Sequence, residues 1–530
     1  MARSYRLVQR DQEFLLPPNM TDWLPGSHLV WFVLDVVDRL DTSEFHATRR
    51  TGGVGRAGYD PDMLLALMIY AYACGERSSR RIEQLCTDHV AYRVVCAQDP
   101  PDHSTIARFR AAHDRAFVEV FAQVLRLCAE AGMVSVGVIS IDGTKIAANA
   151  AKSANRSQDW VREQARRIAA DAVREAADVD AAEDAAEDAA GGPQSPPPQL
   201  GTKAGRAAAI KKAMEEIARQ DARHDEADAA DAARQQDYLR RTEAGEVPTG
   251  PPPAGIDKVR LYELRITRDQ QRLAELGDGG GKPITERRKD LRRILKRWQA
   301  ALEQARAEQA AGLADRRGSA ARIRAYKDAR RAQRGGAVVV NLTDPQARLM
   351  TEGSGGGIVQ GYNSQIVSSD DHLVIGVHVS QDANDTNCFT PALAAATTQT
   401  EALGKTIGLA LADNGYFTED NLTSEDPPRL IAPGKCREVH HGAKHNPAHG
   451  PPPPDLSPLD AMRHKMRQPE NAEKYKRRSA TVEPVIGHLK DRIGLRRFAR
   501  RGMHAVNAEL HLAAAVLNLT RLHHRALATG

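Results

Sequence analysis

The chain has 530 residues, which is too long for one ordinary domain and indicates two to four folded units. Lys and Arg (74) slightly outnumber Asp and Glu (69), so the net charge of +5 favours an anionic partner only where positive charge is locally concentrated. No stretch approaches the ~18 apolar residues of a membrane span. The six cysteines form no C-x-x-C pair, which argues against a zinc ribbon or a disulfide framework. We therefore expect a cytoplasmic protein of several domains with no membrane partner.

Residues 1–134 have the periodicity of an all-helical domain. Asp60 is a candidate N-cap that precedes a proline and a run of apolar residues at helical spacing. A later helix is predicted to begin at Asp102, with Arg108 and Arg110 in its first half. This layout is typical of a helix-turn-helix, so both arginines are candidate DNA contacts, and the alternative is that they are surface charges.

Residues 135–151 contain the first predicted strand. An apolar, β-branched run at 136–141 is followed by Asp142 and Gly143, which is the pattern of a buried strand that feeds a turn. The sequence therefore predicts that Asp142 lies at the end of this strand.

Residues 152–335 are rich in Ala, Arg, Asp and Glu and read as a helical, partly low-complexity insertion. Proline and glycine clusters near 191–198, 251–253 and 279–281 separate the helices. The stretch 174–237 has almost no large apolar residues, so we expect weakly packed helix or disorder there. One helix carries an apolar stripe at helical spacing, formed by Leu291, Ile294, Leu295, Trp298 and Leu302.

Residues 336–530 return to strand-like sequence. Strands are predicted at 337–340, 362–368, 373–380 and 407–412 and at Leu430, with a helix at 389–403. Without the insertion, this order is that of a ribonuclease-H-like α/β fold, in which a mixed sheet is flanked by helices. A generic α/β domain could share the same order.

The end of the chain is predicted to contain a Pro/His/Gly-rich loop at 434–458, a basic helix near 474–490 and an apolar helix near 510–522. Residues 471–530 contain twelve Lys and Arg against four Asp and Glu. Such a local excess favours a phosphate backbone as the partner.

Three acids occupy positions where chemistry could occur. Asp142 and Asp413 each follow an apolar strand, and Glu483 lies on the basic helix. Carboxylate oxygens are the ligands that Mg²⁺ and Mn²⁺ prefer, and two such ions can activate a nucleophile and stabilise a leaving oxygen on phosphate. The alternative for each acid taken singly is an ordinary turn or surface residue.

Two other groups of residues are assigned structural roles. The spacing of the Cys/His cluster in the 434–458 loop matches no known zinc pattern, so we do not favour a metal there: Cys436, His440, His441, His445 and His449. Three further acids are interpreted as turn and capping residues rather than ligands: Asp344, Asp382 and Asp385.

The chain resembles the DDE transposases of bacterial insertion sequences, in the subgroup that has a long helical insertion soon after the first acid. The resemblance covers most of the chain. It rests on several motifs that occur in the same order as in the family, whereas each motif alone is weak evidence. The motifs are YDP at 59–61, DHSTIARFR at 102–110, VISIDGTK at 138–145, GYNSQ at 361–365, ADNGY at 412–416 and YKRRSATVEPVIGHLK at 475–490.

The resemblance implies a catalytic role for Asp142, Asp413 and Glu483, which would hold two divalent ions, Mg²⁺ or Mn²⁺. It also implies that a tyrosine, an arginine and a lysine around the glutamate handle DNA near the cleavage site. Tyr475, Arg478 and Lys490 match the family pattern; Arg478 lies one residue further from Glu483 than in the best-known version, so Arg477 is the alternative.

The expected function is that of a transposase, associated with the nucleoid, that binds the inverted ends of its element. It would cleave there by metal-assisted hydrolysis and use the freed 3′-hydroxyl to attack target DNA, both steps being in-line phosphoryl transfers. Binding of both ends implies a homodimer or higher oligomer with DNA. The alternatives are an inactive, transposase-derived DNA-binding protein and a ribonuclease-H-like nuclease that cleaves without joining.

Overall fold

The structure is a computed structural model of the chain. It describes residues 19–47, 58–168, 202–248, 252–253, 255–276, 282–310, 339–352, 357–423 and 426–529. These form two compact units: unit 1 comprises Met1–Ala150 with Ala347–Gly530, and unit 2 comprises Ala151–Gln346. Unit 2 coincides within about a dozen residues with the predicted insertion. The N-terminal helices and the sheet both belong to unit 1, although the sequence predicted two separate domains for them.

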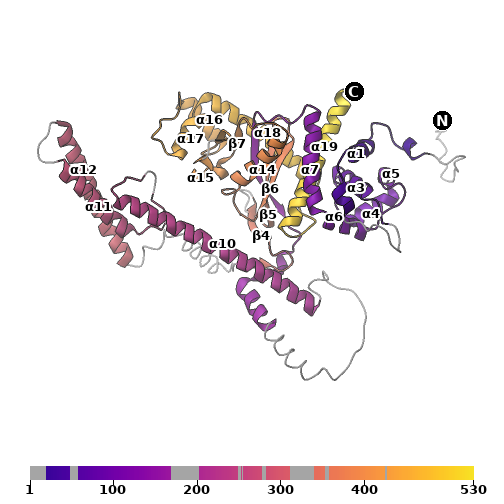
Figure 1. Ribbon diagram of the computed structural model, residues 1–530, viewed down its shortest axis with the longest axis horizontal. Helices are drawn as coiled ribbons and strands as arrows, with labels where there is room; N and C mark the ends of the chain where they lie inside the picture. The colour runs from indigo at the N-terminus through magenta and orange to yellow at the C-terminus, as the bar shows by residue number, and fades with distance from the viewer. Residues whose placement is uncertain are drawn as a thin grey trace, which may run out of the picture. The chain divides into compact units, whose positions relative to one another are not determined.

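Unit 1 is built around a six-stranded mixed sheet (Figure 1). Its strands are β1 (Ile139–Ala147), β4 (Arg348–Glu352), β5 (Gly357–Ser369), β6 (Val374–Ser380), β7 (Ala410–Ala412) and β8 (Arg429–Ile431). The order is β4-β5-β1-β7-β8, and β6 also pairs with β5. Strands β1, β7 and β8 run parallel, whereas β5 is antiparallel to β1, β4 and β6. The predicted mixed sheet flanked by helices is therefore present.

Strand β1 is longer than the sequence predicted. It pairs with β5 without interruption from Ile139, opposite Ser369, to Ala147, opposite Gly361. Because β5 supplies partners along this whole length, the strand continues through Asp142. That residue consequently lies within the strand and not at its end.

The N-terminal region is helical, as predicted. Its helices are α1 (Leu29–Val37), α2 (Ser43–Ala47), α3 (Pro61–Ala73), α4 (Ser79–Asp88), α5 (Val90–Val95), α6 (His103–Ala112) and α7 (Asp114–Glu130). The Asp60 carboxylate caps α3 by accepting a hydrogen bond from the Asp62 N–H. The short helix α5 lies between α4 and α6, so these two helices are not joined by the tight turn that the helix-turn-helix prediction implied.

The N-terminal helices share one apolar core with the end of the chain. Helix α7 lies beside α19 (Met503–Thr529), as the purple and yellow ribbons in Figure 1 show. Arg77 forms an ion pair with Glu509 at 2.8 Å, with 14% and 0% of the two side chains exposed. A second ion pair joins Asp114 to Arg500. These contacts explain why the helical region and the sheet form one unit.

The segment after β6 supplies further elements of unit 1. They are α14 (Phe389–Ala402), η4 (Asn414–Tyr416), α15 (Glu419–Thr423), α16 (Cys436–His445), α17 (Pro458–Met466) and α18 (Pro469–Asp491). The prediction of a loop at 434–458 was wrong in part, because helix α16 lies within this segment. The Glu438 side chain accepts a hydrogen bond from the Lys435 N–H at 3.0 Å and so starts this helix.

Unit 2 is mainly helical. It contains η2 (Lys152–Ala154), β2 (Asn155–Ser157) paired with β3 (Val339–Asn341), and the helices α10 (Lys203–Glu243), α11 (Lys258–Glu275) and α12 (Lys282–Ala310). The predicted stripe lies on α12, where Leu295 is buried and Trp298 donates a hydrogen bond to Asp269 on α11.

The expectation of weak packing across 174–237 is only partly testable, since 169–201 lie outside the described residues. From residue 203 onward the segment is one helix. Weak packing was wrong for its first part, which buries Ile210 and Ile217 against Val161. The described side chains of residues 218–237 are exposed or half-buried, as the prediction of a weakly packed helix requires. No described helix is both long and apolar enough to cross a bilayer.

Candidate active site

Two of the predicted acids occupy equivalent positions on adjacent parallel strands. In the β1–β7 ladder the last pair is Ile141 with Ala412, and an aspartate follows each of them: Asp142 and Asp413. Neighbouring strands lie about 4.8 Å apart, so the two carboxylates belong to one site. The Asp413 side chain also accepts a hydrogen bond at 2.9 Å from the Gly415 N–H, which fixes it at the start of η4.

Arg478 on α18 reaches this site. Its Nη1 lies 3.2 Å from Asp142 Oδ2, and the two side chains are only 12% and 21% exposed. The same Nη1 is buried and makes no hydrogen bond to the described residues. The contact is therefore an ion pair that leaves a donor unsatisfied.

The electrostatics of the site follow from this burial. Burial raises the pKa of Asp142 to about 6, with Arg478 opposing the rise and Asp413 adding to it. Burial alone would lower the pKa of Arg478, but Asp142, Tyr475 and Asp413 together raise it above its ordinary value. The guanidinium is thus a permanent positive charge beside two carboxylates.

The remaining residues predicted on α18 are placed differently. Tyr475 is 3% exposed and packs in an apolar cluster with Leu411 and Leu430, and burial raises its pKa to about 12. Arg477 is exposed and pairs with Asp370 at 2.9 Å. Of the two candidate arginines, Arg478 is therefore the one that reaches the acids.

Glu483 does not face the aspartate pair. Its side chain is exposed and makes no hydrogen bond or ion pair with the described residues. It follows Arg478 by five residues, which at about 100° per residue places it about 140° around the helix. Lys490 is half-buried on the same helix, seven residues further on. The structure thus brings together two of the three predicted acids.

A second carboxylate network, which the sequence did not predict, lies beside the pair. Asp385 Oδ1 accepts hydrogen bonds from Asn363 Nδ2 at 2.8 Å and Gln365 Nε2 at 3.0 Å, and Lys145 Nζ lies 3.5 Å from it. The Tyr416 hydroxyl donates to Gln365 Oε1. Burial first, then Asp385, Asp142 and Asp413, holds the pKa of Tyr416 well above its ordinary value.

The sequence did contain a signal for this network. The GYNSQ motif places Asn363 and Gln365 within a strand that is buried from Gln360 to Ser369. Buried amides require hydrogen-bond partners, so such a pattern indicates a polar network. Asp385 was interpreted as a turn residue because its partners are distant in sequence.

Among the described residues, the side chains of the Cys/His cluster are not gathered in metal-binding geometry. Cys436 and His445 stand at opposite ends of the ten-residue helix α16. Within the described part of the chain, the one group with metal-binding geometry is His46, Asp60 and Asp62, and its first two members are exposed.

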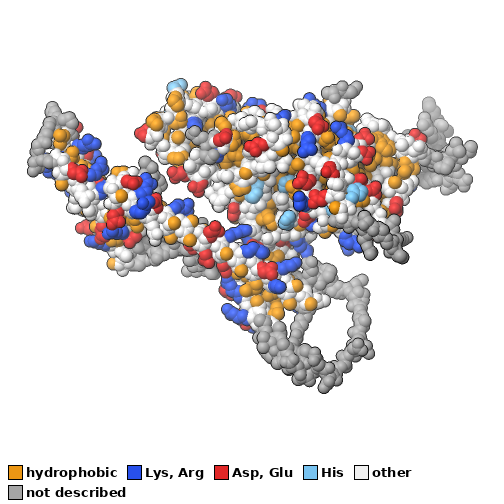
Figure 2. Space-filling view, viewed as in Figure 1, with side chains coloured by type: hydrophobic (Ala, Val, Ile, Leu, Met, Phe, Trp, Pro, Cys, Tyr) orange, Lys and Arg blue, Asp and Glu red, His pale blue; other side chains and the backbone are white. Residues whose placement is uncertain are grey.

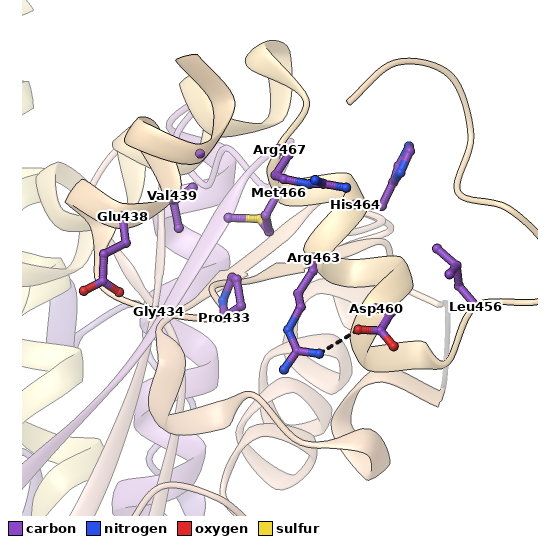
Figure 3. A pocket seen from close by; sticks show the side chains of 11 residues that line it. Pro433, Gly434, Glu438, Val439, Leu456, Asp460, Arg463, His464, Met466 and Arg467 are labelled. Carbon is purple, nitrogen blue, oxygen red and sulfur yellow. Dashed lines mark hydrogen bonds and ion pairs between the residues drawn. The ribbon is translucent and has the colours of Figure 1, made fainter. Parts of the chain in front are cut away.

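A pocket of about 580 Å³ lies near α16 and α17 (Figure 3). Its lining mixes charges, with Glu438 on one wall and Arg463 paired to Asp460 at 2.7 Å on another. Neither Asp142 nor Asp413 lines it. We therefore take the aspartate pair and not this pocket as the candidate active site.

The two arginines predicted to contact DNA differ in their surroundings. Arg108 on α6 is exposed. Arg110 is partly buried and donates to the Arg77 carbonyl at 2.9 Å and to Ser79 Oγ at 3.1 Å, so it connects α6 to the start of α4. On the face in Figure 2, basic and acidic side chains of unit 1 are interspersed.

Comparison with known families supports the resemblance that the motifs indicated. Residues 18–112 match a family described as "Transposase domain (DUF772)", and residues 444–523 match one described as "Transposase DDE domain". No curated protein and no solved structure matches the chain. Two regions of unit 1 are therefore similar to transposase domains. The second contains Glu483, whereas Asp142 and Asp413 lie outside both matched ranges.

Proposed function

We propose that this protein is an insertion-sequence transposase that cleaves DNA at the ends of its element and joins the freed 3′-hydroxyl to target DNA. The observation that carries the proposal is the meeting of Asp142 and Asp413 on adjacent strands of a chain whose two ends match transposase domains. The catalytic role of each residue is part of the proposal.

The donor set at this site fits a hard divalent cation. Asp142 and Asp413 offer carboxylate oxygens, and a buried cation, Arg478, already balances their charge. Mg²⁺ or Mn²⁺, as two ions, would activate the attacking oxygen and stabilise the leaving one. Glu483 is retained by resemblance as the third acid. The chain's own contribution is to hold the first two carboxylates side by side in a largely buried position.

Arg478 is also proposed to bind a phosphate group of the DNA. A guanidinium has five N–H donors, and a phosphate oxygen brought to the aspartate pair would accept a hydrogen bond from one that does not face Asp142. Tyr475 lies beside Arg478, and the two side chains interact. The proposed DNA partner is the end of the element. Simultaneous binding of its two ends implies a homodimer or higher oligomer.

The proposal is tested with the matched inverted repeats from the DNA that flanks the gene. Purified protein should cleave them in Mg²⁺ or Mn²⁺, and Asp142→Ala, Asp413→Ala and Glu483→Ala should each abolish cleavage while end binding persists. Asp382→Ala, an exposed carboxylate, is the control and should retain activity. Full cleavage by any of the first three variants would remove that residue from the assignment.

The same assay separates the alternatives. Joined products in the presence of target DNA identify a transposase, whereas cleavage without joining identifies a ribonuclease-H-like nuclease. End binding without any cleavage by the wild type identifies an inactive DNA-binding protein. Lys490→Ala should weaken binding to specific and random DNA alike and reduce the slope of log K against log salt by about one unit.

A further inference from the structure

The loop between β6 and α14 carries Asp385, a side chain to which no role in the reaction has been given. We propose that Asp385 is a positioning residue that fixes Asp413 next to Asp142 through Gln365 and Tyr416. The inference rests on the proposed function, because it concerns the metal affinity of that aspartate pair.

The first step is the orientation of Gln365. A carboxylate only accepts hydrogen bonds, so Asp385 Oδ1 requires the amide nitrogen of Gln365 to face it, at 3.0 Å. The amide oxygen then faces the opposite way and accepts from the Tyr416 hydroxyl. Asp385 thereby determines the direction of the whole chain of hydrogen bonds.

The second step connects Tyr416 to Asp413. Tyr416 is the last residue of η4, which Asp413 caps, and its N–H donates to the Asp413 carbonyl at 3.3 Å. Asn421 adds a parallel tie, donating to the carbonyls of Thr386 at 2.8 Å and Tyr416 at 2.9 Å. The loop of Asp385 and the turn of Asp413 are thus joined twice.

A glycine next to the first acid makes room for this arrangement. A Cβ atom built on Gly143 would lie 2.4 Å from Asp385 Oδ1 and 2.9 Å from Gln365 Nε2. Such distances do not occur in folded proteins, so Asp385 occupies the space that a side chain at 143 would need. Gly143→Ala therefore displaces Asp385 without removing its carboxylate.

The test measures Mn²⁺ affinity of the full-length protein without DNA, by titration calorimetry or by electron paramagnetic resonance. Loss of a residue that orients a metal ligand typically costs 10–100-fold in affinity. Asp385→Asn should weaken Mn²⁺ binding at least about tenfold, and Gly143→Ala should do the same. The matched controls are Asp382→Asn in the same loop and Gly137→Ala, whose added Cβ meets nothing within 4 Å.

A double-variant cycle distinguishes positioning from direct ligation. If Asp385 acts through Tyr416, then Asp385→Asn combined with Tyr416→Phe should weaken Mn²⁺ binding no more than the stronger single variant. Losses that multiply would mean that Asp385 acts independently of Tyr416, and this would overturn the proposed route. The thermal midpoint of each variant checks that it is folded.

Two further outcomes separate this inference from the function on which it rests. Wild-type binding that Asp142→Asn abolishes, but that Asp385→Asn leaves equal to the Asp382→Asn control, overturns the inference alone. Absence of Mn²⁺ binding by the wild type overturns the proposed metal site and the inference together.

Discussion

Arg478 Nη1 lies 3.2 Å from Asp142 Oδ2, so helix α18 and strand β1 are joined by an ion pair in which neither side chain is more than 21% exposed. A charge in such a position is costly unless its partner remains. The pair therefore fixes the distance of α18 from the sheet, and it places a cation where phosphate and metal charge would meet in the proposed reaction.

We expect Arg478→Met to lower the free energy of unfolding by about 3 kcal/mol at pH 7, because it leaves the Asp142 charge without its partner. Arg477→Met is the control, since Arg477 is 55% exposed and pairs with Asp370, and exposed pairs contribute about 0–1 kcal/mol. Urea denaturation of the two variants gives both values. Equal losses would show that burial of Arg478 carries no energetic weight.

The raised pKa of Asp142 predicts a pH dependence of stability. Burial raises this pKa to about 6, so the folded state keeps a proton that the unfolded chain has already released. The resulting stability is fully present below the unfolded pKa and is lost as the pH rises through about 6. A difference of roughly two pKa units corresponds to about 3 kcal/mol.

The measurement is urea denaturation of the wild type and of Asp142→Asn between pH 4 and pH 7. Asparagine does not titrate, so the free energy of unfolding of the wild type minus that of the variant should decrease as the pH rises. A difference that stays constant, or that increases, would contradict the raised pKa.

Arg108 and Arg110 should respond differently to substitution. Arg108→Ala should weaken binding to the element ends by about 1–3 kcal/mol if the exposed side chain reads a base edge, and random duplex should be affected less. Arg110→Ala should instead destabilise the fold by about 1–3 kcal/mol, because it removes two hydrogen bonds between α6 and α4. Binding assays and thermal denaturation on both variants distinguish the two roles.

Breaking the buried ion pair between Arg77 and Glu509 should cost more than breaking an exposed pair, because it leaves a buried charge without its partner. Glu509 also accepts hydrogen bonds from the N–H groups of Ala499 and Arg500. Arg77→Met should therefore cost about 3–5 kcal/mol. Arg39→Met breaks the exposed pair of Arg39 with Glu130, whose side chains are 64% and 56% exposed. This variant should cost less than about 1 kcal/mol. Calorimetry on the two variants compares them directly.

The sequence predicted most of what depends on local pattern. The cap at Asp60, the α12 stripe and the strand before Asp413 follow from residue types at fixed spacings, and the structure contains all three. It did not predict that β1 continues through Asp142, because that extension depends on β5, more than 200 residues later.

The candidate site shows the same division. The sequence predicted that Asp142 and Asp413 could converge, because both were expected at the ends of apolar strands. In the structure Asp142 lies within β1 and Asp413 follows β7, and the two are still neighbours. The contacts of Asp385 were not predicted, since those with Lys145, Asn363 and Gln365 connect three separate segments. Turn propensity is a local property and contains no information about such contacts.

The packing of α7 against α19 has a consequence for how the protein can be made. The N-terminal helices bury their apolar faces partly on the last helix, and Arg77 finds its partner 432 residues later in the chain. During translation this face stays uncovered until α19 has been synthesised. A message truncated before codon 503 therefore yields a fragment without α19, in which apolar residues of the N-terminal helices stay exposed. Such fragments should aggregate and should not compete with the intact protein for DNA.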